Sequence, residues 1–198
     1  SAFYSGPLML ELGASGPSAR VLWRGKSNSE INTDALHALI CTPVIEGDHI
    51  YGVDSHGELR CLDLKTGNRL WEDLTATPKA RWSNIHMVRN GDKVWMFNER
   101  GELLIARLAP DGFHEISRTK LIEPTTDQLG QRGGVTWSHP AFANRCMLAS
   151  AVATGSVPTY GNHLRDRRQP GLDELDPSQR NALADILKRV TTRYDNLF

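Results

Sequence analysis

The sequence predicts an all-β fold built from repeated four-stranded antiparallel sheets and followed by a C-terminal α-helix. The first observation is an internal repeat, in which Gly47-Asp48 aligns with Gly91-Asp92. Gly57-Glu58-Leu59 likewise aligns with Gly101-Glu102-Leu103, so the unit recurs after 44 residues. The second observation is that β-rich runs alternate with glycine turns in both copies. A period of about 40–50 residues is typical of propeller blades. We therefore expect a partial β-propeller with two complete four-stranded blades and two partial ones.

Each copy contains four expected strands joined by tight turns. The β-rich runs are residues 44–45, 50–53 and 59–64 with an outer strand ending near Trp71, and residues 87–88, 94–97 and 103–108 with an outer strand ending near Ile116. Glycine suits the intervening turns because it adopts positive φ without steric cost. Asp54 and Asp63 fall at hairpin turns, where carboxylates are favoured for turn formation.

Fragments of the same unit flank the two copies. Residues 8–12 and 21–23 match the second half of a blade, with Trp23 in the position of Trp71. Downstream, residues 138–142 align with residues 41–45 and open a third copy. No second strand or glycine turn is recognised after Leu148, so this copy is expected to break off.

The pattern changes near the C-terminus. Asp176-Pro177 has the form of a helix N-cap followed by a first-turn proline, and apolar residues then recur at helical spacing. These residues are Leu183, Ile186, Leu187, Val190 and Tyr194. We expect three regions: a partial propeller at residues 1–148, a linker or junction at 149–171, and an amphipathic helix at 172–198.

Composition excludes several classes of function. The chain of 198 residues has 23 basic and 23 acidic residues, so nucleic-acid binding driven by overall charge is not expected. No apolar run approaches the roughly 20 residues that span a bilayer. Cys41, Cys61 and Cys146 stand far apart without metal-type histidine spacing, so neither a metal site nor a disulfide framework is predicted.

Residues 61–71 indicate how neighbouring blades pack on each other. A small residue, an aspartate, a Thr-Gly pair and a tryptophan follow at fixed spacing. Thr-Gly shapes a turn, the aspartate caps it, and the tryptophan buries a large apolar surface between blades. The segment is similar to the tryptophan-docking motif of quinoprotein-type, PQQ-like β-propellers, with cysteine in place of alanine. The expected docking residues are Cys61, Asp63, Thr66, Gly67, Trp71 and Trp23.

The repeat region resembles the PQQ-like propeller proteins of planctomycete-type bacteria, which are related in fold to the outer-membrane assembly lipoprotein. The resemblance covers roughly residues 1–148 and depends on segments such as 59–67, 97–108 and 137–143. It implies an exported, periplasmic or extracellular protein, mostly non-enzymatic and without catalytic residues. Quinoproteins that hold PQQ resemble one another in a vicinal cysteine pair and acidic calcium ligands. No two cysteines are adjacent here, so neither PQQ nor calcium is expected as a cofactor.

The C-terminal residues 172–198 carry a second resemblance, to a helix of galactose-1-phosphate uridylyltransferase. It implies a cytoplasmic enzyme and makes a fragment of a nucleotidyltransferase the alternative function. The chain has no His-Pro-His motif to supply a nucleophile for uridylyl transfer. Because the first resemblance stops within a blade and the second starts within a domain, one interpretation is a chimera of unrelated pieces. A natural two-part protein is the other.

The candidate ligand site lies on the inner strands, which line the central channel of a propeller. These strands carry His86 and His139, and Arg81, Trp82 and Trp137 lie near them in sequence. Together they would form a polar and aromatic pocket at the channel mouth for a small ligand or a protein partner. The alternative is that the histidines are hydrogen-bonded structural groups. The leading function is a non-catalytic binding or scaffold module, with self-association through open blade faces as a further expectation.

Overall fold

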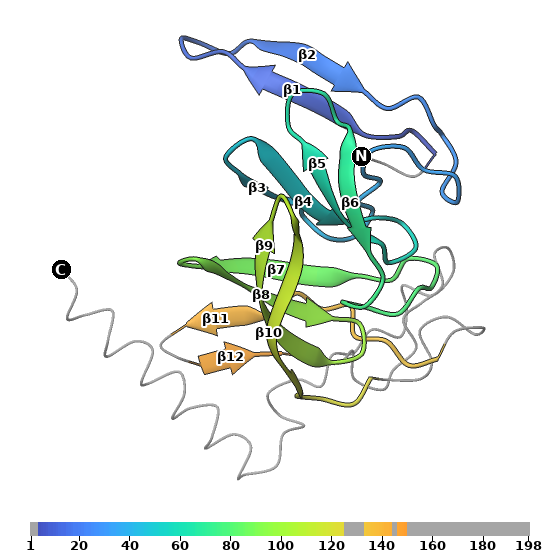
Figure 1. Ribbon diagram of the computed structural model, residues 1–198, viewed down its shortest axis with the longest axis vertical. Helices are drawn as coiled ribbons and strands as arrows, with labels where there is room; N and C mark the ends of the chain where they lie inside the picture. Colours follow the sequence, from blue (N-terminus) through green and yellow to red (C-terminus); the bar gives the residue numbers. More distant parts are fainter. Residues whose placement is uncertain (1–3, 125–132, 144–145, 150–198) are drawn as a thin grey trace, which may run out of the picture. The chain divides into compact units, whose positions relative to one another are not determined.

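The computed structural model describes residues 4–124, 133–143 and 146–149. The chain divides into two compact units, residues 1–157 and 158–198, and every described strand belongs to the first. The described residues form four antiparallel sheets and no helix (Figure 1). The predicted all-β class is therefore confirmed. The helix predicted at residues 172–198 lies outside the described residues. Within the described ranges, no helix is long and apolar enough to cross a membrane.

The two predicted complete blades are present as four-stranded sheets. The second blade consists of β3 (Val44–Glu46), β4 (His49–Val53), β5 (Leu59–Asp63) and β6 (Arg69–Asp73). The third blade consists of β7 (Ile85–Asn90), β8 (Lys93–Asn98), β9 (Glu102–Ala109) and β10 (Gly112–Lys120). In each blade consecutive strands pair antiparallel, from an inner first strand to an outer last strand.

Two partial blades flank them. The first blade is the pair β1 (Leu8–Leu12) and β2 (Ala19–Arg24), and the fourth is the pair β11 (Ala141–Ala143) and β12 (Cys146–Leu148). The last copy is a partial blade, as predicted, but it contains a second strand that was not recognised in the sequence: β12 pairs with β11 and sets Phe142 opposite Met147. The strand was missed because this copy lacks the Gly-Asp pair that marks the same turn in the other two.

Glycine occupies the inner hairpin turns for a conformational reason. Gly47, between β3 and β4, has φ 57°, and Gly91, between β7 and β8, has φ 65°. Both values lie in the left-handed region that other residues rarely adopt. The repeated Gly-Asp pairs of the sequence are therefore the repeated turns of the structure.

The side chains of β5 alternate between the two faces of the sheet and so contribute to two separate cores. Leu59 and Cys61 are fully buried in a core with residues of the third blade, including Ile85 and Met96. Leu62, whose side chain points to the opposite face, packs instead in a core that includes Trp23 of the first blade. A middle strand is thus buried on both faces, and the stability of each blade depends on its neighbours.

Each described outer strand, β2, β6 and β10, contains a β-bulge. The pairing register shifts and leaves one extra residue, which is Leu22 in β2, Leu70 in β6 and Ile116 in β10. A bulge bends its strand and increases the local twist. The residue directly after the bulge is Trp23 in β2 and Trp71 in β6, so the bend lies next to both tryptophans.

These two tryptophans bind the blade that follows. The indole Nε1 of Trp23 donates a hydrogen bond to the Leu64 carbonyl oxygen at 2.8 Å. The indole Nε1 of Trp71 donates to the Ala109 carbonyl oxygen, also at 2.8 Å. Both acceptors lie where the third strand of the next blade turns into the fourth. A half-buried indole needs such an acceptor for its N–H, and both interfaces provide it in the same place.

The turn that receives Trp23 is built by its own polar side chains. Asp63 Oδ1 accepts hydrogen bonds from the Thr66 backbone N at 2.8 Å and from Thr66 Oγ1 at 2.7 Å. These bonds lower the pKa of Asp63 below its usual value. Gly67 has φ 74°, and a Cβ atom there would lie 2.9–3.0 Å from three atoms of the Trp23 ring. Asp63 therefore stabilises this turn through its hydrogen bonds to Thr66. Only glycine at position 67 leaves room for the Trp23 ring to approach the turn.

Replacement of Gly67 by alanine tests this close approach. Gly67 and Gly91 both have positive φ, but a Cβ at Gly91 meets no atom within 4 Å. We expect Gly91→Ala to lower the free energy of unfolding by about 1 kcal/mol through φ alone. Gly67→Ala adds displacement of the Trp23 ring and is expected to cost about 2–4 kcal/mol in a denaturant titration. Equal losses for the two variants would contradict the ring contact.

A second prediction concerns the tryptophan itself. Trp71→Ala removes both the ring and its hydrogen bond, and we expect a loss of about 3–5 kcal/mol, more than for Trp95→Ala. Trp71→Phe keeps most of the packing and removes only the N–H donor, so its expected cost is about 1–2 kcal/mol. Equal and small effects of Trp71→Ala and Trp95→Ala on urea unfolding would show that docking does not depend on Trp71.

Candidate functional site

Arg81 and Trp82 form a cluster with Glu30, just before the inner strand β7. The Arg81 guanidinium carbon lies 4.3 Å from the centre of the Trp82 ring, a distance suited to a cation–π contact. Glu30 binds both residues, with Oε1 2.7 Å from Arg81 Nε and Oε2 3.4 Å from Trp82 Nε1. Glu30 comes from the long loop between the first and second blades, so the cluster joins that loop to the start of the third blade.

The backbone of Trp82 is held in an uncommon conformation. Its φ is 62°, which is unfavourable for a residue with a bulky side chain. The Trp82 backbone N donates to the Ser55 carbonyl oxygen at 2.7 Å, and the Ala80 N donates to the His56 carbonyl oxygen at 3.0 Å. These bonds fix the segment on the second blade and hold the strained residue in place. Such strain persists only where the surroundings determine it, and it clusters at binding sites.

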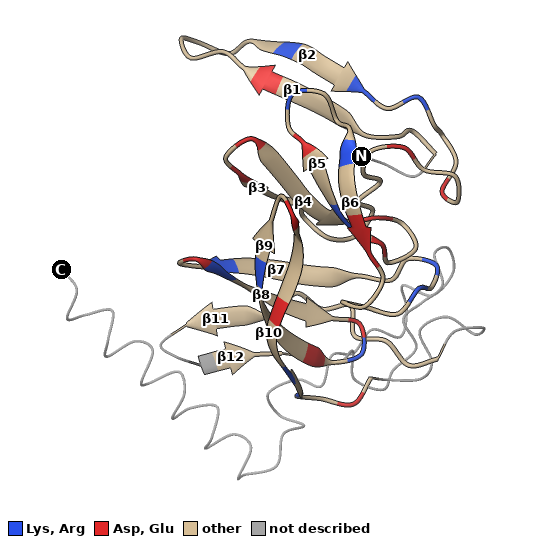
Figure 2. Ribbon diagram, in the orientation of Figure 1, with Lys and Arg blue, Asp and Glu red and all other residues tan. Residues whose placement is uncertain are grey.

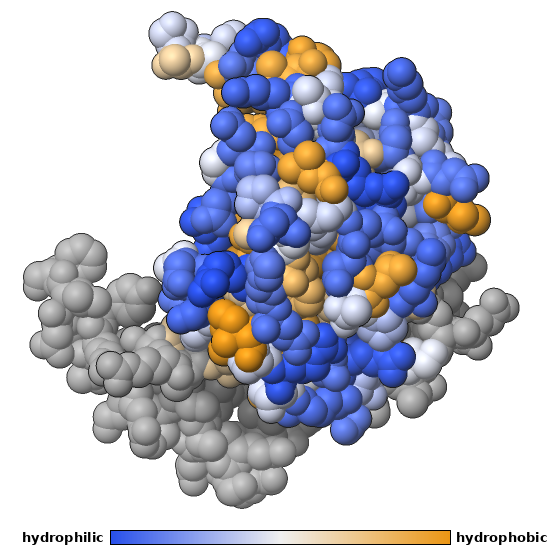
Figure 3. All heavy atoms as spheres, viewed as in Figure 1, coloured by the Kyte–Doolittle hydropathy of each residue, from blue (hydrophilic) through white to orange (hydrophobic). Residues whose placement is uncertain are grey.

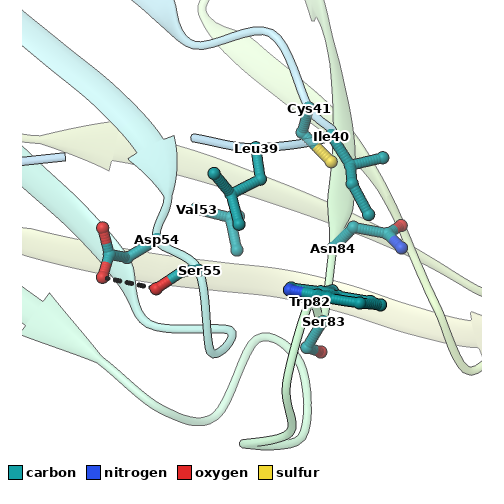
Figure 4. Close-up of a pocket in the computed structure, with 9 residues that line it drawn as sticks. All are labelled: Leu39, Ile40, Cys41, Val53, Asp54, Ser55, Trp82, Ser83 and Asn84. Carbon is teal, nitrogen blue, oxygen red and sulfur yellow. Dashed lines mark hydrogen bonds between the residues drawn. The ribbon is translucent and has the colours of Figure 1, made fainter. Parts of the chain in front are cut away.

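A small cavity lies beside Trp82. It has a volume of about 10 Å³, which is room for one water molecule. Figure 4 shows its lining residues, with Asp54 and Ser55 at one side and Ile40 and Asn84 at the other. Burial raises the pKa of the Cys41 thiol in this lining to about 12. The thiol is therefore protonated at neutral pH and is a poor nucleophile.

Asn84 is the site residue that sequence reasoning missed. Its side chain is 1% exposed, and neither amide atom has a hydrogen-bond partner within the described ranges. A buried unpaired amide is costly and calls for an explanation. The repeat could have revealed it, because Asn84 aligns with the aliphatic Ile40 of the preceding copy. A polar residue replaces an apolar one at an equivalent inner position.

His86, Trp137 and His139 form a second cluster, between the third and fourth blades. The ring centres of His86 and His139 are 4.9 Å apart, and His86 Nε2 lies 3.1 Å from the Trp137 carbonyl oxygen. Burial lowers the pKa of His86, and the nearby His139 adds to this effect. The Trp137 indole N–H is buried and has no hydrogen-bond partner among the described residues.

The structure thus divides the five predicted ligand residues into two clusters. The small cavity contacts Trp82 but none of the other four. Basic and acidic residues are both scattered over the strands and turns of the described sheets, with no large region of one sign (Figure 2). Within the described part of the chain, there is no group of three or more His, Cys, Asp or Glu residues placed to hold a metal ion.

A buried ion pair next to the first cluster was not expected from the sequence. Asp54, assigned to turn formation, is instead 2% exposed, and its Oδ2 lies 2.9 Å from Arg60 NH1. Asp54 Oδ1 also accepts a hydrogen bond from the His37 backbone N at 2.5 Å, and Arg60 NH1 donates to the Ala35 carbonyl oxygen at 3.0 Å. Arg60 Nε completes the network at 2.9 Å from Glu72. The network fastens the loop that carries Glu30 to the second blade.

Arg60→Met is the test of this network. It leaves the Asp54 carboxylate buried without its cation, which is expected to cost about 3–5 kcal/mol of unfolding free energy. Arg69→Met is the matched control, because Arg69 also pairs with Glu72 but its side chain is 47% exposed. An exposed pair contributes about 0–1 kcal/mol. If the thermal unfolding curves of Arg60→Met and Arg69→Met coincide, the assignment of Arg60 to a buried network is contradicted.

The comparison with protein-family models agrees with this fold. Repeated four-stranded antiparallel blades define a β-propeller type of repeat protein. The chain belongs to the family described as outer membrane protein assembly factor BamB, whose model matches residues 12–163, more than half of the chain. Residues 172–198, for which the sequence suggested a uridylyltransferase helix, lie beyond this match.

One solved structure with a similar arrangement is BamB from Moraxella catarrhalis. Its sequence identity to this chain is 16%, with a TM-score of 0.44, and the match covers 75% of this chain. The chain spans 35% of the length of that protein. No curated protein matches the sequence.

Proposed function

We propose that this chain is a non-catalytic, protein-binding scaffold in the assembly of outer membrane proteins. The observation that carries the proposal is the family match over residues 12–163. The family description names an assembly factor for outer membrane proteins, and a protein-binding role for this chain is our interpretation of that description. On this proposal the location is the periplasmic side of the outer membrane. The proposal also includes a relationship of this chain to the PQQ-like propeller proteins of planctomycete-type bacteria.

The cluster of Arg81, Trp82 and Glu30 is the contact site we assign to a protein partner. Arginine and tryptophan are enriched among the residues that dominate binding energy. Here the indole and the guanidinium are already stacked and held by Glu30, so little side-chain freedom is lost when a partner binds. The face of the molecule drawn in Figure 3 is mostly hydrophilic, with hydrophobic residues in small separate groups.

The proposal also includes the organisation of the chain. Residues 1–148 are the propeller blades that bind, residues 149–171 a junction, and residues 172–198 a helix of separate origin. Self-association through blade faces stays a prediction. On the first blade, the apolar surface that would mediate self-association consists of Leu10, Leu12 and Val21, which are 42%, 75% and 58% exposed.

The test is association with the outer-membrane assembly machinery. The tagged full chain, supplied with an export signal, is produced in a Gram-negative bacterium that lacks its own factor of this family. We expect the machinery to co-purify with the chain from detergent extracts. Trp82→Asn, which tolerates the left-handed backbone, is expected to weaken this association about 30-fold, the effect of a typical binding-site tryptophan.

The control variant is Arg107→Ala, which removes an exposed charge on β9 of the third blade. It is expected to leave association unchanged. Co-purification that is absent for the wild-type chain, or equally reduced by both substitutions, contradicts the proposal. Transfer of uridylyl groups between UDP-glucose and galactose-1-phosphate by the purified chain would contradict its non-catalytic character.

A further inference from the structure

The histidine pair between the third and fourth blades has a specific arrangement of protons. His86 Nε2 lies 3.1 Å from the Trp137 carbonyl oxygen, and His139 Nδ1 lies 2.6 Å from the Pro140 carbonyl oxygen. A carbonyl oxygen only accepts hydrogen bonds, so each of these ring nitrogens carries the proton. The remaining nitrogens, His86 Nδ1 and His139 Nε2, therefore carry lone pairs.

Neither lone pair is used by a residue that the structure describes. Within residues 4–124, 133–143 and 146–149, no hydrogen-bond donor reaches His86 Nδ1 or His139 Nε2. His86 is 5% exposed and lies between the packed third and fourth blades. His139 is exposed, which gives solvent a path to the pair.

The arrangement shares two features with metal-binding histidines. Such a histidine donates its second N–H to a backbone carbonyl or a carboxylate, which fixes the ring and its tautomer. With Zn–N bonds of about 2.0–2.1 Å, two imidazoles on one ion have their ring centres about 5 Å apart. The centres of His86 and His139 are 4.9 Å apart, and the ring planes are inclined by 54°.

We propose that His86 Nδ1 and His139 Nε2 form a two-histidine site for a borderline divalent cation such as Zn²⁺, with water completing its coordination. The inference goes beyond the proposed function and does not depend on it. It also departs from the sequence-based expectation of no metal site, because the two histidines are far apart in the chain and only the packing of blades brings them together.

The position of the site suggests what the cation does. The first two blade junctions each contain a docked tryptophan, but the residue after the bulge of β10 is Ser117. The third and fourth blades instead share an edge contact between Trp95 and Phe142, with ring centres 4.8 Å apart. A cation bound by His86 of β7 and His139 before β11 would link these two blades at the junction that lacks the tryptophan.

The test is zinc titration of the metal-free full chain by calorimetry. We expect one zinc ion to bind at micromolar concentration, and His139→Ala to weaken binding at least about tenfold. His114→Ala is the matched control, because His114 is exposed and paired with Asp111 on the β9–β10 turn. Cys146→Ser excludes a thiolate ligand. Circular dichroism confirms that each variant is folded.

Nitrogen NMR of the imidazoles gives a second readout. Without metal, His86 is expected as the Nε2–H tautomer and His139 as the Nδ1–H tautomer, and zinc should shift His86 Nδ1 and His139 Nε2. The proposal is overturned by the opposite tautomers, by no binding at micromolar zinc, or by binding that His139→Ala leaves unchanged. Binding that is lost only in Cys146→Ser also overturns it.

Discussion

The hydrogen bond from a tryptophan indole to a carbonyl of the next blade is the interaction on which this structure depends. It occurs twice, at 2.8 Å each time, from Trp23 to Leu64 and from Trp71 to Ala109. Hydrophobic burial alone does not fix the position of one sheet on another, because apolar contact is non-directional. The indole N–H adds direction, so each interface combines a large buried ring with a single polar anchor. The cores on both sides of the second blade then form in register.

The parts of the fold that recur in the sequence could be predicted from it. The Gly-Asp turns and the segment 61–71 identified two blades, because the same turn conformation and the same packing require the same residues twice. The Asp54–Arg60 pair could not be predicted, since an aspartate at a hairpin end reads as a turn residue until the loop of residues 30–37 is seen to cover it. The positive φ of Trp82 was equally hidden, because it follows from bonds to the second blade rather than from local preference.

The inner ends of the strands differ in character from the docked outer strands. The outer junctions satisfy their polar groups, whereas the inner ends contain an unpaired Asn84 amide and an unpaired Trp137 indole N–H among the described residues. Stability and binding are thus located at different edges of the same sheets. The third blade, which receives Trp71 of the second blade at Ala109, tolerates unfavourable polar burial and backbone strain at its inner end. Sites of this kind are where local sequence rules are expected to fail.

The bulges of the outer strands have a consequence for how other chains approach. A last strand presents a row of unpaired backbone groups, and an exposed edge of this kind recruits foreign strands by β-augmentation. The extra residue in β6 and in β10 interrupts that row near its middle. Charged side chains on the same strands, Glu72 in β6 and Arg118 in β10 among them, add electrostatic protection. The rim of these blades is therefore a poor template for amyloid-like stacking, and recognition of other proteins is directed to the loops.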